Sequence, residues 1–248
     1  MNASARRAFV GCLEREIWRY LQSPLQTILN TVFSNFLLLT VLYFVDPTKI
    51  ALVLPGVILY ATFTVVASNA RMALFVGRIE GTLQYLLAAP ISRLHLYVIN
   101  LFAAVLRALL VSLLLLGAGM LCFFRQPPAH PIMFICGWTL MTFTFASIGI
   151  LLACSYKNWN SFGVMENYVI IPLLFFSGCF FSLEHIPAHY HWLLYANPFS
   201  HFSTVLRFGF SGHAELSVPI TLLGALTVWL LSTIACALLF RSGRRLLQ

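Results

Sequence analysis

The stretch LYVINLFAAVLRALLVSLLLLGAGMLCFF, residues Leu96–Phe124, carries one charged side chain, Arg107, in a run of apolar residues. An α-helix needs about 20 apolar residues to cross the roughly 30 Å hydrocarbon core of a bilayer, so this stretch is long enough to span a membrane. Five further apolar stretches are also of membrane length. The sequence therefore predicts an all-α integral membrane protein with six transmembrane helices: Leu25–Val45, Ile50–Ala70, Leu96–Phe124, Ile132–Ser155, Val164–Ser182 and Ser217–Phe240.

The composition of the 248-residue chain excludes an ordinary soluble domain. Hydrophobic residues make up 60% of it and charged residues 9%, with a mean hydropathy of +0.88, whereas soluble domains carry about 25% charged residues. The net charge of +8 comes from basic residues that flank apolar runs, which indicates a membrane lipid partner and no nucleic acid. The six cysteines show no CxxC spacing and are interpreted as small core residues.

The basic residues also predict the orientation of the spans. Eleven of them fall on one side of the predicted membrane, whereas only Lys49, Arg125 and Arg207 fall on the other. Because cytoplasmic loops are enriched in Lys and Arg, both termini are expected in the cytoplasm, and no cleavable signal is evident. The eleven are Arg6, Arg7, Arg15, Arg19, Arg71, Arg78, Arg93, Lys157, Arg241, Arg244 and Arg245.

Residues 1–24 form a separate segment before the first span. Phe9, Leu13, Ile17 and Tyr20 recur at helical spacing, with charged residues between them. This pattern predicts an amphipathic helix on the cytoplasmic membrane surface that ends near Pro24. The helix is either a simple membrane anchor or a binding surface for a partner.

The loop 77–95 between the second and third spans contains another candidate helix. Ile79, Leu83, Leu86 and Leu87 would share one helical face, and Pro90 marks its end. A short helix with an apolar face and an exposed carboxylate, Glu80, suits docking into a groove on another protein. The alternative is a helix packed on the lipid surface.

The segment 183–213 is too polar to span a membrane and is interrupted by Pro187 and Pro198. Its Trp and Tyr residues favour short helices at the outer membrane interface. It also holds five of the seven histidines, and His185 and His189 have a spacing that could bind a metal. No HExxH pattern and no nearby cysteine completes a ligand set, so no metal site is expected.

Two charges fall within predicted spans. A charged side chain inside a membrane is costly, so Arg107 is either functional, snorkels to the interface or pairs with another group. Glu166, about one turn into the fifth span, is its candidate partner.

The sequence lacks the motifs of an energy-converting or catalytic site. Neither lysine of the chain follows a glycine, so there is no GxxxxGK[ST] phosphate loop, and no GxSxG motif is present. If a nucleoside triphosphate drives this protein, a separate subunit hydrolyses it.

Several short motifs together resemble the membrane permease of type-2 ABC exporters. They are Leu54-Pro55-Gly56, Glu80-Gly81-Thr82-Leu83 with Leu86-Leu87-Ala88-Ala89-Pro90-Ile91-Ser92, Ser177-Gly178 with Phe180-Phe181, Ile186-Pro187, Asn197-Pro198 and Arg207. Each motif is short, but their order and spacing match over nearly the whole chain.

This resemblance implies a domain layout and a set of partners. Residues 1–24 would be a cytoplasmic interface helix and residues 25–248 a six-span transporter domain of a bacterial inner membrane protein. Arg78–Ala89 would be a coupling helix that docks on an ATP-binding cassette ATPase subunit, and that subunit, not this chain, would hold ATP and Mg. The docking residues would be Arg78, Glu80, Leu83, Leu86 and Leu87.

The resemblance further implies a homodimer of permeases with two ATPase subunits, whose export path lies between the permeases. Pro187, Asn197, Pro198 and Arg207 would belong to external re-entrant helices that cap this path. The chain would therefore be a transport subunit without covalent chemistry, and not an enzyme. Its substrate would be an amphiphilic, lipid-like or drug-like molecule or a lipid-linked saccharide.

Two other classes of protein stay open. A channel or secondary carrier that works without an ATPase fits the missing phosphate loop equally well, although no inverted repeat is visible. A membrane-embedded metal-dependent enzyme would need the external histidines as ligands.

Overall fold

A computed structural model describes residues 3–22, 28–88, 92–124, 126–156, 158–182 and 187–242, and every regular element in these ranges is a helix. The prediction of an all-α protein is confirmed for this part of the chain. The longer helices are α1 (Ala3–Leu21), α2 (Asn30–Val45), α3 (Ile50–Arg71), α6 (Arg93–Cys122), α7 (Pro131–Ser155), α11 (Pro198–Ser211) and α12 (Val218–Ser242). The shorter ones are η2 (Pro47–Lys49), η3 (Met72–Val76), α4 (Gly77–Ile79), α5 (Thr82–Ala88), α8 (Trp159–Met165), η4 (Glu166–Ile170), α9 (Ile171–Phe175), η6 (Ala188–Tyr190) and α10 (His191–Ala196).

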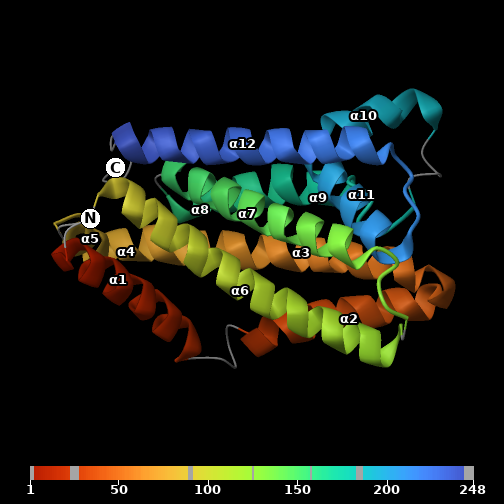
Figure 1. Ribbon diagram of the computed structural model, residues 1–248, viewed down its shortest axis with the longest axis horizontal. Coiled ribbons are helices and arrows are strands. Elements are labelled where there is room, and N and C mark those ends of the chain that lie inside the picture. The colour runs from red at the N-terminus through yellow and green to blue at the C-terminus, as the bar shows by residue number, and fades with distance from the viewer. Residues whose placement is uncertain are drawn as a thin grey trace.

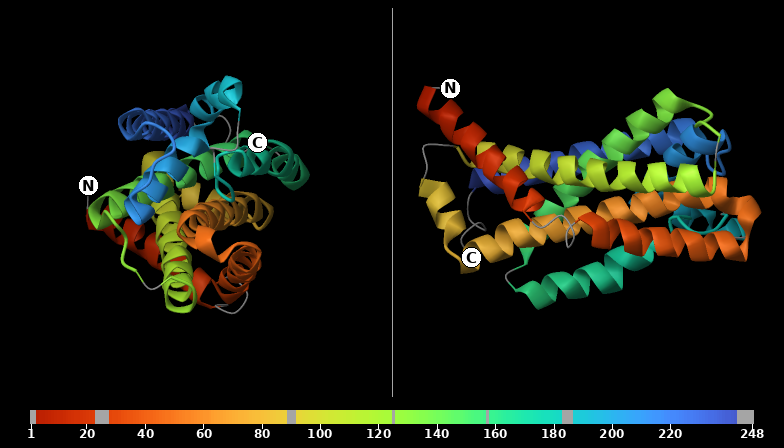
Figure 2. Two further views of the ribbon diagram at one scale, coloured as in Figure 1. Left: turned by 90° about the vertical axis from the view of Figure 1, so that its right-hand side faces the viewer. Right: turned by 90° about the horizontal axis from the view of Figure 1, so that it is seen from below.

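Four helical segments are long and apolar enough to cross a membrane. They are Pro47–Ile79, Arg93–Cys122, Pro131–Ser155 and Val218–Ser242, and they correspond to the second, third, fourth and sixth predicted spans. The other two predicted spans are shorter helices that run alongside these four (Figures 1 and 2). The first corresponds to the 16-residue α2, and residues 25–27 at the start of its predicted range lie outside the described residues. The other consists of α8, η4 and α9 in succession.

The fifth predicted span, Val164–Ser182, is wrong at its C-terminal boundary, since the helix ends at Phe175. Beyond it, the Ser177 hydroxyl donates a hydrogen bond of 2.6 Å to the Leu174 carbonyl, and Gly178 adopts a φ of 80°. A hydroxyl that takes up a carbonyl of the last turn and a glycine in the left-handed region both end a helix. The seven residues from Phe176 to Ser182 therefore form a loop and not a last helical turn.

α3 is the central helix of the bundle, and it packs on α2, α6, α7 and α11. In the most apolar stretch of its span 78% of the residues are buried, compared with 17% for α12. A helix that is apolar on all faces is buried in protein or lies against lipid. α3 is the first kind, whereas α12 lies at the edge of the bundle in Figure 1 and exposes apolar side chains such as Leu223 and Leu231, as expected of a lipid-facing helix.

The helical segment Pro47–Ile79 is longer than a bilayer is thick. At 1.5 Å per residue its 33 residues extend about 50 Å, compared with about 30 Å of hydrocarbon. Its far end carries α4 and is followed by α5, at the same end of the bundle as the start of α1 and the end of α12 (Figure 1). We call residues 77–88, which comprise α4, Glu80, Gly81 and α5, the hairpin. The 177–182 loop and α10 lie toward the opposite end.

Candidate functional site

The 177–182 loop lies directly against the backbone of α3. Gly56 makes the contact, because a Cβ atom added there would lie 1.7 Å from the carbonyl oxygen of Cys179. On the same side of α3, the Tyr60 ring packs on the ring of Phe180, with centroids 5.8 Å apart. Only a glycine allows the loop backbone to come so close to the helix.

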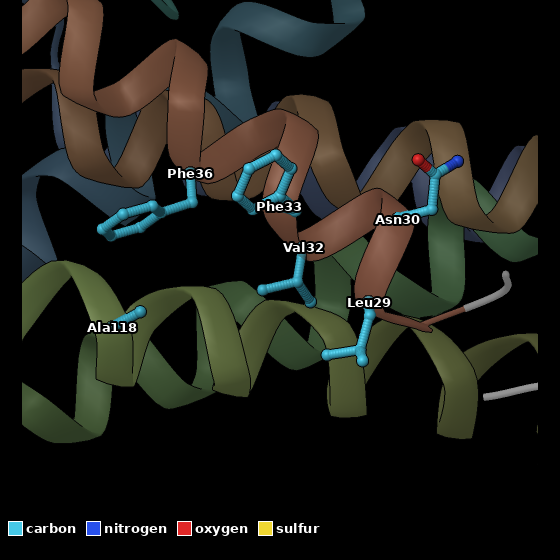
Figure 3. A pocket seen from close by; sticks show the side chains of 6 residues that line it. All are labelled: Leu29, Asn30, Val32, Phe33, Phe36 and Ala118. Carbon is cyan, nitrogen blue, oxygen red and sulfur yellow. The ribbon is translucent and has the colours of Figure 1, made fainter. Parts of the chain in front are cut away.

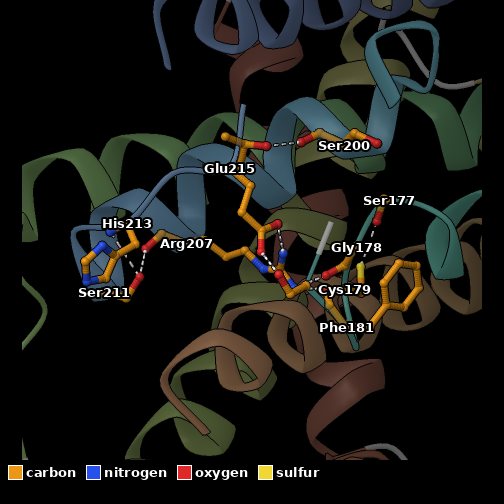
Figure 4. A network of polar contacts seen from close by, with 11 residues as sticks. Ser177, Gly178, Cys179, Phe181, Ser200, Arg207, Ser211, His213 and Glu215 are labelled. Carbon is orange, nitrogen blue, oxygen red and sulfur yellow. Dashed lines mark hydrogen bonds and ion pairs between the residues drawn. The ribbon is translucent and has the colours of Figure 1, made fainter. Parts of the chain in front are cut away.

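Arg207 holds the loop from its other side (Figure 4). The side chain extends from α11, is only 4% exposed and forms an ion pair of 3.0 Å with Glu215. Its Nη2 atom donates hydrogen bonds to the carbonyls of Phe181, at 2.8 Å, and of Gly178. A buried guanidinium requires such acceptors, so Arg207 fixes both the loop and the segment that follows α11.

Asn197 connects α11 to α8, η4 and α9, which we together call the fifth segment. Its side-chain oxygen accepts a hydrogen bond of 3.0 Å from the Phe199 amide and so caps α11, whose first residue is Pro198. Its amide nitrogen donates to the Leu173 carbonyl of α9 at 2.7 Å. We call Gly56, the 177–182 loop, Asn197, Arg207 and Glu215 the Arg207 cluster.

The structure thus brings together motifs that are spread over about 150 residues of the sequence: Leu54-Pro55-Gly56, Ser177–Phe181, Asn197-Pro198 and Arg207. Pro187 does not join this cluster; it is exposed, and its carbonyl accepts the Tyr190 amide at 2.9 Å. Helix α11 itself dips back into the bundle, where the Phe199 ring packs on Phe63 and Phe145.

The histidines of this region do not form a metal site among the described residues. No three His, Cys, Asp or Glu side chains gather there in a way that could hold an ion. His201 is buried in α11, whereas His189 and His213 are exposed. His185 lies outside the described residues.

At the other end of the bundle, the single helix expected over Arg78–Ala89 is interrupted. Gly81 adopts a φ of 73°, a left-handed conformation that glycine permits, and α5 begins only at Thr82. The break moves Ile79 and Leu83 to different faces, since Ile79 is 85% exposed and Leu83 is 4% exposed. The prediction that the two share one docking face is therefore wrong: Leu83 packs inward near Gly77.

Among the described side chains of the hairpin, the exposed ones are Ile79, Glu80, Gln84 and Tyr85. Arg78 is half-buried, with its Nη1 atom 3.5 Å from the Tyr156 carbonyl and its guanidinium 5.5 Å from the centroid of the Phe75 ring. Arg78 thus anchors the hairpin to the bundle. The side chains of Leu86 and Leu87 lie outside the described part of the structure, although their backbone belongs to α5.

Arg107 does not pair with Glu166, so that predicted pair is wrong. Arg107 instead lies 3.5 Å from the Glu16 carboxylate of α1, donates 2.5 Å to the Glu16 carbonyl, and stacks 4.8 Å from the centroid of the Tyr20 ring. Arg107 is the fifteenth of the 30 residues of α6, and α1 packs against this helix. The amphipathic helix α1 can therefore reach it.

Glu166 pairs with Arg71, at 2.9 Å between Nη1 and Oε2. This pair joins the end of α3 to the fifth segment, and both side chains are largely buried. The sequence identified Glu166 as an intramembrane charge but counted Arg71 only among the loop charges, because the predicted second span ended at Ala70. The helix continues past that residue, and a longer window could have included Arg71.

The sequence of this chain matches a known protein family over most of its length. The family model described as "ABC-2 type transporter" matches residues 7–211, which is most of the chain. The chain belongs to the ABC-2 type transporter family. The matched region runs from α1 to the end of α11 and includes the hairpin, the Arg107–Glu16 and Arg71–Glu166 pairs, and Arg207.

Individual relatives agree with this family. The chain is 23% identical over 243 residues to "Inner membrane transport permease YadH" of Escherichia coli strain K12, and the match covers 94% of each chain. The protein of the same name from Shigella flexneri matches equally well. In this ABC-2 type transporter the two polar sites at opposite ends, the hairpin with Arg71–Glu166 and the Arg207 cluster, are therefore the candidate functional regions.

Proposed function

We propose that this ABC-2 type transporter is the permease subunit of an ATP-driven exporter, with ATP hydrolysed by a separate ATP-binding cassette subunit. The observation that carries the proposal is the hairpin, which extends the longest membrane helix beyond a bilayer thickness and presents Ile79, Glu80 and Tyr85 to the surroundings. An exposed apolar and acidic surface at the end of a rigid helix suits a groove on a partner protein.

The energy for transport comes from this partner. The chain has no phosphate loop, so ATP and Mg bind on the ATPase subunit. Closure of two ATPase subunits would move the hairpins and, through them, the helices of the bundle as rigid bodies. The permease contributes the path and two alternative packings.

The location follows from the relatives and from the basic residues. The relatives carry the name of an inner membrane permease, and the described helices are those of a multi-pass protein. Arg71, Arg78 and Arg93 surround the hairpin, so the positive-inside rule puts the hairpin and both termini in the cytoplasm. The Arg207 cluster then lies toward the outside.

A second copy of the chain completes the path. α2 exposes Phe33, Val41 and Phe44, and the fifth segment exposes Tyr168 and Phe175. α2 and the fifth segment are also shorter than the four long membrane helices. Shorter helices gain from a protein neighbour in the bilayer, because a helix that does not match the bilayer thickness is relieved by oligomerisation. The homodimer therefore forms along these two segments.

The substrate is amphiphilic, lipid-like or drug-like, or a lipid-linked saccharide. A cavity of about 530 Å³ between α2 and α6 supports this class, because apart from Asn30 its walls are apolar (Figure 3). It is lined by Leu29, Asn30, Val32, Phe33, Phe36 and Ala118. A cavity of this kind accepts an acyl chain or an aromatic ring more readily than a sugar or an ion.

Purification in mild detergent tests the proposal. The tagged protein should retain a near-stoichiometric soluble protein with a phosphate loop, identified by mass spectrometry. Glu80→Lys and Tyr85→Asp should each reduce the retained amount at least about tenfold, because they place a reversed or buried charge in the docking surface. Asp46→Lys, the same charge reversal on a partly exposed residue outside the hairpin, is the control.

Two outcomes would contradict the proposal. A wild-type protein that carries no ATPase subunit, under conditions that preserve a known exporter complex, would indicate an independent channel or carrier. Full retention of the partner by both hairpin variants would show that the hairpin is not its docking surface.

A further inference from the structure

Arg71 and Glu166 join two short π-helices. Arg71 is the last residue of α3 and directly precedes η3, while Glu166 is the first residue of η4. Their side chains meet at 2.9 Å, and the Glu166 side chain is only 7% exposed. The pair thus fixes the starting points of two irregular turns that belong to different segments of the bundle.

Aromatic contacts reinforce this junction. The Arg71 guanidinium lies 5.1 Å from the centroid of the Phe162 ring, one turn before Glu166. The Phe162 ring in turn meets the Phe75 ring of η3 edge-on, with centroids 6.1 Å apart. The two segments are therefore held together by an ion pair, a cation–π contact and a ring contact.

π-Helices are rare, appear mostly as single turns, and are found frequently at functional sites. Each holds one residue more than the corresponding α-helical turn. When a π-turn becomes α-helical, the helix beyond it rotates by about 100° and shifts by about 1.5 Å. Beyond η3 lies the hairpin, and beyond η4 lie α9 and the 177–182 loop.

The junction therefore lies on a continuous path of contacts from one end of the molecule to the other. On one side, η3 leads through Gly77 into the hairpin. On the other side, α9 offers its Leu173 carbonyl to Asn197 and leads into the loop that Arg207 holds. A change at the hairpin can thus reach the opposite end without passing through the packed core of α3.

We propose that the Arg71–Glu166 pair is the joint that transmits movement of the hairpin to the fifth segment and the 177–182 loop, an assignment that rests on the proposed function. Arg71 and Glu166 act as positioning residues: they touch no substrate, and they set the register of η3 and η4 relative to each other. The ATPase subunit moves η3 through the hairpin, and the ion pair makes η4 follow.

Charge exchange at the pair tests this assignment. The complex of the full chain with its co-purified ATPase subunit is placed in nanodiscs of phosphatidylethanolamine and phosphatidylglycerol. Amide hydrogen exchange of peptides that cover residues 166–182 is then measured with and without ATP and vanadate. The variants are Arg71→Glu, Glu166→Arg and the two together. The matched control is the partly exposed pair Asp46–Lys49, reversed in the same three ways.

In the wild type, trapping with nucleotide should change exchange in residues 166–182 at least about twofold. Each single variant should lose this change while it still binds the ATPase subunit, and the double variant should regain it. A merely structural pair would alter the thermal midpoint but not the response to nucleotide. The three control variants should respond as the wild type does.

The possible failures are distinct. If the wild type carries no ATPase subunit, the proposed function fails, and the joint fails with it, since nothing drives the hairpin. If the subunit is bound and the single variants respond to nucleotide as the wild type does, only the joint is overturned. Loss of the response in the double variant as well would also overturn it, because the pairing would not be the property that matters. Where a single variant does not fold, Arg71→Lys with Glu166→Gln provides the broken pair.

Discussion

Replacing Gly56 by alanine should displace the 177–182 loop from α3. The added methyl group would lie 1.7 Å from the Cys179 carbonyl oxygen and 2.5 Å from its carbonyl carbon. Contacts of this kind below 3.0 Å do not occur in folded proteins, so the loop or the helix must move by at least 1.3 Å. Both partners are backbone atoms, and no side-chain rotation can relieve the overlap.

The loss of folding free energy in Gly56→Ala depends on the contacts that the 177–182 loop makes. Overpacking of a tight interior site costs about 1–3 kcal/mol. A loop displaced by more than an ångström also lengthens the hydrogen bonds from Arg207 to Phe181 and Gly178, and each bond to a charged group contributes about 1.5–3 kcal/mol. For a chain of this size, a loss of about 3 kcal/mol lowers the unfolding midpoint by roughly 10 °C.

Two measurements check this expectation. Thermal unfolding in detergent gives the midpoint, and maleimide labelling of Cys179, which is fully buried, reports the loop itself. The exposed Cys122 and Cys136 and the half-buried Cys12 are replaced by serine in the background. Gly56→Ala should lower the midpoint and make Cys179 reactive.

Gly117→Ala is the matched control. Gly117 lies in α6 with no atom within 4 Å of an added Cβ, so alanine should leave the midpoint unchanged or raise it by its better helix propensity. If Gly56→Ala unfolds at the wild-type temperature and Cys179 stays unlabelled, the close approach of loop and helix is refuted.

Two further substitutions probe Asn197 and Glu16. Asn197→Ala should lower the unfolding midpoint by several degrees, because it removes a helix cap worth about 0.5–2 kcal/mol and leaves the Leu173 carbonyl without that donor. Asn158→Ala is the control and should leave the midpoint unchanged, since the Asn158 side chain makes no cap hydrogen bond. Similar midpoints for the two variants would contradict the bridging role. Glu16→Ala should free α1 from Arg107 and speed maleimide labelling of Cys12 at least about threefold. The reason is that burial and the nearby Glu16 carboxylate both raise the pKa of the Cys12 thiol, and the substitution relieves both. Glu14→Ala, at an exposed position of the same helix, is the control. Equal labelling rates in the two would show that Glu16 does not hold α1.

The sequence identified most residues of the Arg207 cluster without showing that they meet, and it missed Glu215, the partner of Arg207. Asn197-Pro198 is a local signal for the start of a helix, and Gly56 and Gly178 are residues where a backbone comes close or turns. The contact between Gly56 and Cys179 depends on how two distant segments pack, and no pattern in either segment specifies it.

The break at Gly81 could have been predicted from the sequence. A glycine three residues into a predicted helix is a signal for a left-handed turn, but the apolar spacing of Ile79, Leu83 and Leu87 favours an unbroken helix. The local backbone preference decided the outcome, and with it which of these side chains faces the bundle.

By itself the sequence determined the class of protein, most of the membrane helices and the candidate polar residues, because apolar length and charge placement are properties of a continuous stretch of chain. Only the tertiary structure decided which charges pair. Arg107 lies against Glu16 and Arg71 against Glu166, because an ion pair in a low-dielectric interior forms between whichever opposite charges the packed helices bring within about 4 Å. That depends on helix adjacency and depth, which three-dimensional packing sets.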